Sequence, residues 1–257
     1  MNSFFSLIGL TTTSVIATVF IAVPSHSALR KIPLTEQTLN HLTIGSVEIA
    51  DVTNEFHDYT YDYEYNNSAS SWISSPIDST IDKVDLIVDK VINIGQKIWN
   101  VVEKGKPVAN YSSSSANALP ENATRWNQLE NWSAPKSKII TVVYKNVYGM
   151  EVIRFTYRIM LLYGGTVGGV GKYIGYANVE PLEMTTAYMY TFNVKASVDS
   201  VYNMGTKTNP LAGMILNIQW TVETVLKKST TTHTYTLDGL GNINVPSNKL
   251  IKFTHLK

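Results

Sequence analysis

Alternation of apolar and polar residues dominates the second half of this 257-residue sequence. Successive side chains of a β-strand point to opposite faces, so a period of two indicates a strand with one buried face. The most regular stretch has Asn217, Gln219, Thr221 and Glu223 alternating with an apolar set: Met214, Leu216, Ile218, Trp220 and Val222. Similar stretches recur between turn residues, and we therefore predict a β-meander over residues 138–253.

The first two segments of the meander allow a prediction of register. A two-residue loop near Tyr148 and Gly149 pairs Val142 with Phe155, and it pairs Ile140 with Tyr157. Both apolar sets then share one face, whereas a loop one residue longer places Val142 beside Arg154. Because a slip of one residue turns every side chain to the other face, the pattern favours the even register.

A different spacing precedes the meander and is typical of an amphipathic helix. Apolar residues recur three and four positions apart, as Ile77, Ile81, Val84, Val88, Val91, Ile98 and Val102. Asp78 or Ser79 can cap the start, while Gly105 and Pro107 end it. We expect a helix over about residues 78–103 and a Ser-rich linker over residues 107–137. The fold predicted from these elements is α+β, with a twisted antiparallel sheet of six or seven long strands packed on the helix.

The N-terminus carries an uncharged apolar run from Leu7 to Val23, followed by Pro24 and small residues as far as Ala28. This order is typical of a secretory signal peptide, which we assign to residues 1–28, leaving a single domain over residues 29–257. The alternative is an uncleaved anchor, since about 17 apolar residues is the lower limit for a bilayer span. The signal peptide predicts an exported protein, periplasmic or extracellular.

The amino-acid composition argues against several classes of function. The chain has no cysteine, so it has no disulfide, thiolate nucleophile or cysteine metal site. A formal net charge of +1 argues against electrostatic binding of nucleic acid or of an anionic membrane. We expect no stable membrane insertion once the signal peptide is removed, and the partner is an unknown ligand or protein.

Two sequence patterns could indicate a cofactor site or a metal site, but neither pattern meets the requirements of such a site. Gly164 to Lys172 is rich in glycine, but a phosphate-binding loop needs glycine where Thr166 stands and a hydroxyl side chain where Tyr173 stands. A hairpin connection explains this stretch better. The histidines show no metal-ligand spacing, and no serine lies in a nucleophile elbow. We predict no cofactor and no metal.

The remaining candidate residues fall into three groups. Asp58, Asp62 and Glu64 alternate with tyrosines over residues 55–65. These carboxylates are either catalytic or the solvated face of a strand. Trp126 and Trp132 lie in the polar linker, where their rings either bind a ligand or hold the linker on the sheet. Arg154 and Arg158 share the polar face of one strand and can receive an anion, unless that face is merely solvated.

These observations support an exported, non-enzymatic protein that binds a ligand or associates with the cell envelope. We name Trp126, Trp132, Arg154 and Arg158 as its candidate ligand-binding residues. One alternative is an outer-membrane β-barrel, which long alternating strands suggest. Another is a secreted glycan hydrolase that uses Asp58, Asp62 or Glu64.

Overall fold

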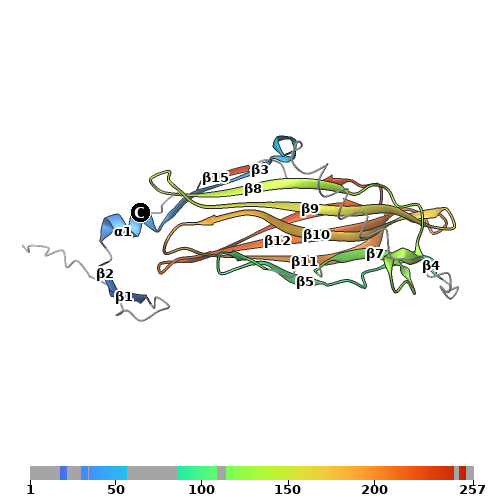
Figure 1. Ribbon diagram of the computed structural model, residues 1–257, viewed down its shortest axis with the longest axis horizontal. Coiled ribbons are helices and arrows are strands. Elements are labelled where there is room, and N and C mark those ends of the chain that lie inside the picture. The colour runs from blue at the N-terminus through green and yellow to red at the C-terminus, as the bar shows by residue number, and fades with distance from the viewer. Residues whose placement is uncertain are drawn as a thin grey trace, which may run out of the picture.

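Strands account for nearly all of the regular structure in this protein. The computed structural model describes residues 18–21, 30–33, 35–56, 86–108, 114–245 and 249–252. Within these ranges the one α-helix is α1 (Glu36–His41), accompanied by two single 3-10 turns, η1 (Thr53–Glu55) and η4 (Trp126–Gln128). The predicted α+β class is therefore wrong, and the fold is two curled antiparallel sheets (Figure 1).

The two sheets hold seven and six strands. The order in the larger is β15 (Lys249–Lys252), β3 (Ile44–Asp51), β8 (Lys136–Asn146), β9 (Glu151–Val167), β10 (Val170–Thr186), β7 (Ala116–Glu121) and β4 (Ile87–Ile92). The order in the smaller is β14 (Ile243–Asn244), β13 (Lys228–Asp238), β12 (Ala212–Glu223), β11 (Thr191–Asn203), β5 (Ile98–Glu103) and β6 (Lys106–Pro107). The meander thus divides after β10, where the chain crosses from one sheet to the other.

The long helix expected over residues 78–103 is absent from its described part, residues 86–103. β4 and β5 occupy this part and belong to different sheets, while residues 78–85 lie outside the described ranges. Ile98, assigned to the buried helical stripe, is 67% exposed, whereas Trp99 beside it is buried. The segment is rich in isoleucine and valine, whose branched side chains suit strands. At the change of sheet, the Asn93 side chain accepts hydrogen bonds from the backbone N–H groups of Gly95 and Asn117, both at 3.0 Å.

The predicted Ser-rich linker contains a strand of the larger sheet. β7 pairs with β10 through Ala116 and Ala118, and both alanines are fully buried. Both alanines belong to the apolar core of the molecule. The rest of the connection reaches β8 through η4.

The predicted register of the first hairpin is confirmed. Val142 pairs with Phe155 and Ile140 pairs with Tyr157. The loop itself is longer than two residues, and an irregularity after Tyr144 restores the pairing. The core therefore fixes the register, and the loop adapts to it.

The core lies between the two sheets, on their facing sides. The predicted inward face of β12 is confirmed, with Trp220 fully buried in its middle. Tyr157 of the larger sheet packs against Trp220 with ring centroids 6.3 Å apart, and its hydroxyl is 2.5 Å from the hydroxyl of Tyr235 on β13. Phe155 and Phe192 make a second contact between the sheets, at 5.6 Å.

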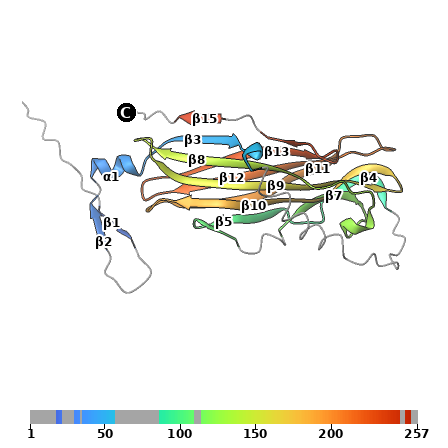
Figure 2. The same ribbon diagram turned by 45° about the horizontal axis from the view of Figure 1, so that its top comes forward.

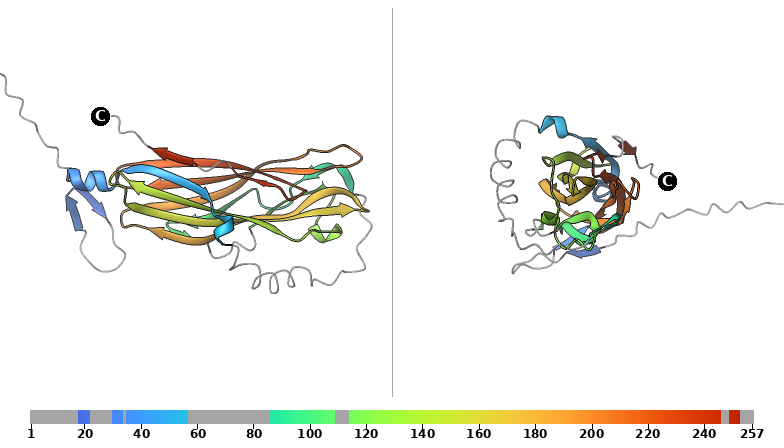
Figure 3. Two further views of the ribbon diagram at one scale, coloured as in Figure 1. Left: turned by 90° about the horizontal axis from the view of Figure 1, so that it is seen from above. Right: turned by 90° about the vertical axis from the view of Figure 1, so that its right-hand side faces the viewer.

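The strands run along the long axis of the molecule, so that the turns gather at two ends (Figure 3). We call one the α1 end, defined by the turns at residues 104–105, 147–150, 187–190 and 224–227. The far end is defined by the turns at residues 168–169, 204–211 and 239–242. A short hairpin of β1 (Thr18–Ile21) and β2 (Arg30–Pro33) lies beside α1 at the α1 end (Figure 1 and Figure 2).

Candidate functional site

The two candidate tryptophans hold the linker against the larger sheet. Trp126 and Trp132 contact one another edge to face, with ring centroids 6.1 Å apart, and both pack against the core. The backbone N–H of Ser133 donates to the carbonyl of Tyr163 on β9 at 2.9 Å. The structure therefore brings these two residues together, in a packing contact.

Gly165 of the Gly-rich stretch and Gly175 of β10 make room for Trp132. A Cβ atom added at Gly175 would lie 2.8 Å from the Trp132 ring, and one added at Gly165 would collide with the same ring. The hairpin interpretation of this stretch is confirmed, because β9 and β10 join through Gly168 and Gly169, both with positive φ. A two-residue turn of this kind needs positive φ at both positions.

Arg154 and Arg158 lie on the outer face of β9, and a carboxylate already engages each one. The Arg154 guanidinium donates to Glu151 at 2.9 and 2.5 Å. The Arg158 guanidinium donates to Glu180 at 3.0 and 2.5 Å, and both side chains of this second pair are nearly buried. Four residues along a strand separate the two arginines by about 13 Å. They are therefore not placed to hold one small anion between them.

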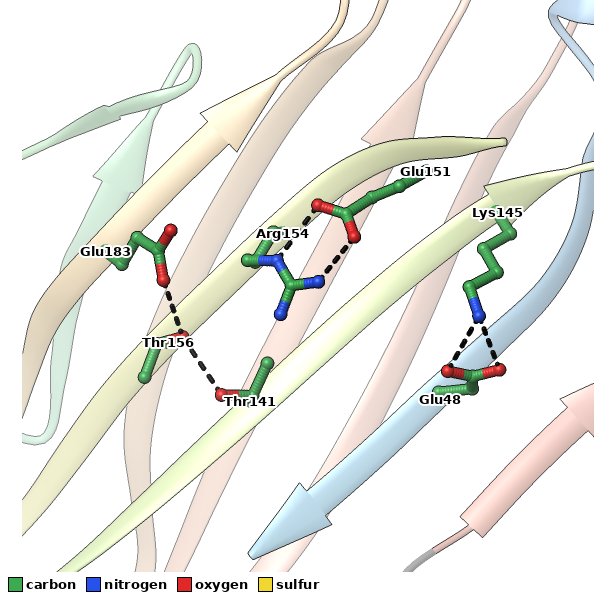
Figure 4. A network of polar contacts seen from close by, with 7 residues as sticks. All are labelled: Glu48, Thr141, Lys145, Glu151, Arg154, Thr156 and Glu183. Carbon is green, nitrogen blue, oxygen red and sulfur yellow. Dashed lines mark hydrogen bonds and ion pairs between the residues drawn. The ribbon is translucent and has the colours of Figure 1, made fainter. Parts of the chain in front are cut away.

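Further polar contacts cover the same face on β3, β8, β9 and β10 (Figure 4). The Lys145 ammonium donates to both carboxylate oxygens of Glu48, at 2.9 and 3.0 Å. The hydroxyls of Thr141 and Thr156 lie 3.0 Å apart, and Thr156 also donates to Glu183 at 3.5 Å. Opposite charges are thus matched across neighbouring strands, which leaves little net charge to attract a ligand.

The carboxylates proposed for hydrolysis, Asp58, Asp62 and Glu64, lie outside the described residues. Among the residues that are described, no three histidine, aspartate or glutamate side chains gather as metal ligands. No helix in the described ranges has the length and apolar character that crossing a bilayer requires.

The turns of the α1 end have an unusual composition. Turns are ordinarily rich in glycine, asparagine, aspartate and proline. Three turns here read Val-Tyr-Gly-Met at 147–150, Ala-Tyr-Met-Tyr at 187–190 and Thr-Val-Leu-Lys at 224–227, and the fourth is Lys104-Gly105. The structure describes all of these residues, and none of them is acidic. Five of their large apolar side chains are exposed: Tyr148, Met150, Tyr188, Val225 and Leu226.

Hydrogen bonds fix these turns at one end of the molecule. The buried Asn146 side chain accepts from the backbone N–H groups of Tyr148 and Met150, at 3.1 and 3.0 Å. The Tyr190 hydroxyl donates to the carbonyl of His41 at 2.7 Å, and the Asn146 amide donates to the same carbonyl at 3.3 Å. Burial raises the pKa of Tyr190 to about 12, so this hydroxyl keeps its proton to a higher pH than an exposed tyrosine does. The end of α1 is therefore attached to two of the turns.

The remaining two turns lie beside the same strand ends. The backbone N–H of Gly105 donates to the carbonyl of Phe192 at 2.8 Å, next to the start of β11. Thr191, the first residue of β11, pairs with Glu223 at the end of β12, directly before the 224–227 turn. All four turns thus belong to one surface, built from both sheets.

The far end differs in composition. Its turns are Gly168-Gly169, the polar segment 204–211 and Gly-Leu-Gly-Asn at 239–242. Met204 and Leu240 are exposed apolar residues within these turns, and Val170 and Tyr202 are exposed on the strand ends beside them. Chemically, the α1 end offers apolar and aromatic contacts together with two lysines. Inspection of the sequence alone missed this site. The signal available was the replacement of ordinary turn residues by tyrosine, methionine and leucine.

Comparison with known proteins identified no relative of this chain. No protein-family model, curated protein or solved structure matched the chain.

Proposed function

We propose that this chain is an exported, non-enzymatic binding protein and that the α1 end is its binding surface. The observation that carries the proposal is the set of exposed apolar side chains on turns that contain no acidic residue. Turns held by a rigid sandwich are a common place for binding residues. Exposed apolar residues scattered singly are ordinary, but a group at one end of the molecule indicates an interaction site.

Export is supported by the apolar run at residues 7–23, which precedes α1 in the sequence. Such a protein meets its partner in the cell envelope or outside the cell. The ion pairs on the outer face of the larger sheet support the choice of the α1 end, because they neutralise the arginines proposed as a ligand site.

Binding to washed envelopes of the producing cells tests this function. The full chain is purified after export, its N-terminus is sequenced, and its sedimentation with the envelopes is measured. The test variant is Tyr188→Asp with Leu226→Asp at the α1 end. The control is Met204→Asp with Leu240→Asp, which places the same charges at the far end on side chains of similar exposure.

We expect the wild type and the far-end control to sediment with the envelopes and the α1-end variant to remain in solution. Circular dichroism and melting temperature confirm that all three proteins are folded. Equal envelope binding by both variants would contradict the assignment of the surface. No binding by the folded wild type would contradict the function itself.

A further inference from the structure

One edge of the smaller sheet is open over most of its length. β13 pairs with β12 from end to end, whereas β14 pairs with β13 only at Thr236 and Leu237. Within the described part of the chain, residues 228–234 of β13 have no neighbouring strand on the side away from β12, and we call them the open edge. We propose that the open edge is a dimerisation surface, and that its partner is the open edge of a second copy of this chain.

The hydrogen bonding within the smaller sheet shows which backbone groups face outward. In an antiparallel pair, facing residues alternate between those that exchange hydrogen bonds and those that do not. The backbone N–H of Thr224 donates to the carbonyl of Lys227 at 2.9 Å, and the pairing continues from this turn without a register shift. The odd-numbered residues of β13 therefore bond to β12, and the even-numbered ones direct their N–H and C=O groups outward. Along the open edge these are Lys228, Thr230, Thr232 and Thr234.

The other sheet edges carry features that hinder pairing with another strand. Such features are short length, lysine, proline and irregular register. β15 has four residues and a lysine at each end, β6 has two residues and ends in Pro107, and the register of β4 shifts between Ile87 and Val91. The open edge reads Lys-Ser-Thr-Thr-Thr-His-Thr, with a regular register and a lysine only at its start. Because threonine favours strands, this edge is suited to accept another strand.

The limits of the open edge select a second copy as its partner. The 224–227 turn bounds it on one side and β14 on the other, so that its middle residue is Thr231. A two-fold axis at this residue places Thr230 opposite Thr232 of the second copy, and Lys228 opposite Thr234 of the second copy. Every outward-facing residue then meets another one, as antiparallel hydrogen bonding requires. Threonine pairs across strands are favourable, and no like charges face each other along this edge.

The size of the contact predicts a reversible dimer. Residues 228–234 of each copy take part, whereas a standard interface contains about 20–30 residues on each side. We therefore expect a dissociation constant in about the micromolar range. Antiparallel pairing places the α1 ends of the two copies at opposite ends of the dimer and leaves both accessible. Dimerisation is thus separate from binding at the α1 end, and either can be absent without the other.

Sedimentation velocity of the full chain at increasing concentration tests the dimer. We expect the wild type to change from monomer to dimer between about 1 and 300 µM. Thr232→Pro removes an N–H group that faces the second copy, without removing a bond to β12, and edge positions tolerate proline. The two-fold axis repeats this loss, so the dissociation constant should rise about tenfold to a hundredfold. Thr232→Val keeps the N–H group and is the matched control, which should dimerise nearly as the wild type does.

Variants with paired charges test the register and the identity of the partner. Thr230→Lys with Thr232→Lys places like charges opposite one another in the dimer, and Thr230→Glu with Thr232→Glu does the same, so each protein alone should be monomeric. An equal mixture of the two should form a heterodimer. Thr230→Lys with Thr232→Glu places opposite charges across the dimer and should associate with itself. Both positions are exposed, and circular dichroism and melting temperature confirm that each variant is folded.

Amide hydrogen exchange distinguishes a second copy from cover by the protein's own chain. The amides of Thr230 and Thr232 should exchange more slowly as the protein concentration rises. The amides of Thr231 and His233, which face β12, should exchange slowly at every concentration. A wild type that stays monomeric at about 300 µM overturns the proposal. A dimer that Thr232→Pro leaves intact also overturns it, as does slow exchange at Thr230 and Thr232 that is independent of concentration. Failure of the two oppositely charged variants to associate overturns the two-fold pairing.

Discussion

The two faces of β9 differ in how they bury their side chains. Phe155 and Tyr157 point toward the smaller sheet, where apolar side chains of β11 and β12 fill the space around them. Thr156 and Arg158 point the other way and are also buried, but polar partners on neighbouring strands surround them. The inner face therefore depends on packing volume, whereas the outer face depends on matched hydrogen bonds and charges.

The largest expected effect tests the inner face. Trp220→Ala removes a fully buried ring that contacts Tyr157, and should lower the free energy of unfolding by about 3–5 kcal/mol. Gln219 is the adjacent residue on the opposite, exposed face of β12, so Gln219→Ala should cost under about 0.5 kcal/mol. Chemical denaturation measures both. Equal losses would show that the two sides of β12 do not differ in burial.

The second prediction tests the outer face. Arg158→Met leaves the Glu180 carboxylate nearly buried without its ion pair, and should cost about 3 kcal/mol. Combining it with Glu180→Leu should recover most of that loss, since an apolar pair replaces a buried ion pair at little cost. Arg154→Met is the matched control, because its pair with Glu151 is more than a third exposed. It should cost under about 1 kcal/mol, and an equal loss at both arginines would remove the distinction between them.

The same contrast explains which parts of the fold the sequence predicts. The inner faces follow from local alternation, so the buried set around Trp220 and the pairing of Val142 with Phe155 were correct. A partner such as Glu180 for Arg158 depends on the register between β9 and β10, which shifts at several irregularities. No local pattern reveals those shifts. Arg154 and Arg158 were correctly placed on one face, but their carboxylate partners were missed.

The error over residues 78–103 has a related cause. Apolar residues three and four apart satisfy a helical pattern, yet in the part that the structure describes they belong to two strands in different sheets. Ile92 and Ile98 bracket a change of sheet, and pairing with distant strands such as β7 and β11 determines their structure. Intrinsic preference is a weak guide where long-range pairing decides. The exposed turns of the α1 end were missed because an apolar turn residue looks the same as a buried one in sequence.

A third prediction concerns a polar contact placed inside the apolar core. Tyr235→Phe leaves the buried hydroxyl of Tyr157 without the partner that lies 2.5 Å away. The loss should be about 1–2 kcal/mol at neutral pH, well below that of Trp220→Ala, because the ring and its packing remain. Denaturation at neutral pH measures it. A loss as large as that of Trp220→Ala would mean that this hydroxyl pair, rather than packing, dominates the inner face.

The pH dependence sharpens this prediction. Burial is the main cause that raises the pKa of Tyr235 to about 12, and burial also raises the pKa of Tyr157 well above its ordinary value. In the unfolded chain both phenols ionise near pH 10. The stability that neutral tyrosines contribute is therefore complete below pH 10 and is lost as the pH rises toward 12. Tyr235→Phe removes one of these groups, so its deficit relative to the wild type should shrink over that range.

The smallest expected effect lies at the edge of the outer face. Lys145 and Glu48 form two hydrogen bonds, but both side chains are about a third exposed or more, so water screens their attraction. Glu48→Gln should therefore change the free energy of unfolding by under about 0.5 kcal/mol, and salt should reduce even that difference. Denaturation at low and high salt measures it. A loss comparable to that of Arg158→Met, unaffected by salt, would show that the face is buried up to its edge and that the exposure of a pair does not determine its contribution here.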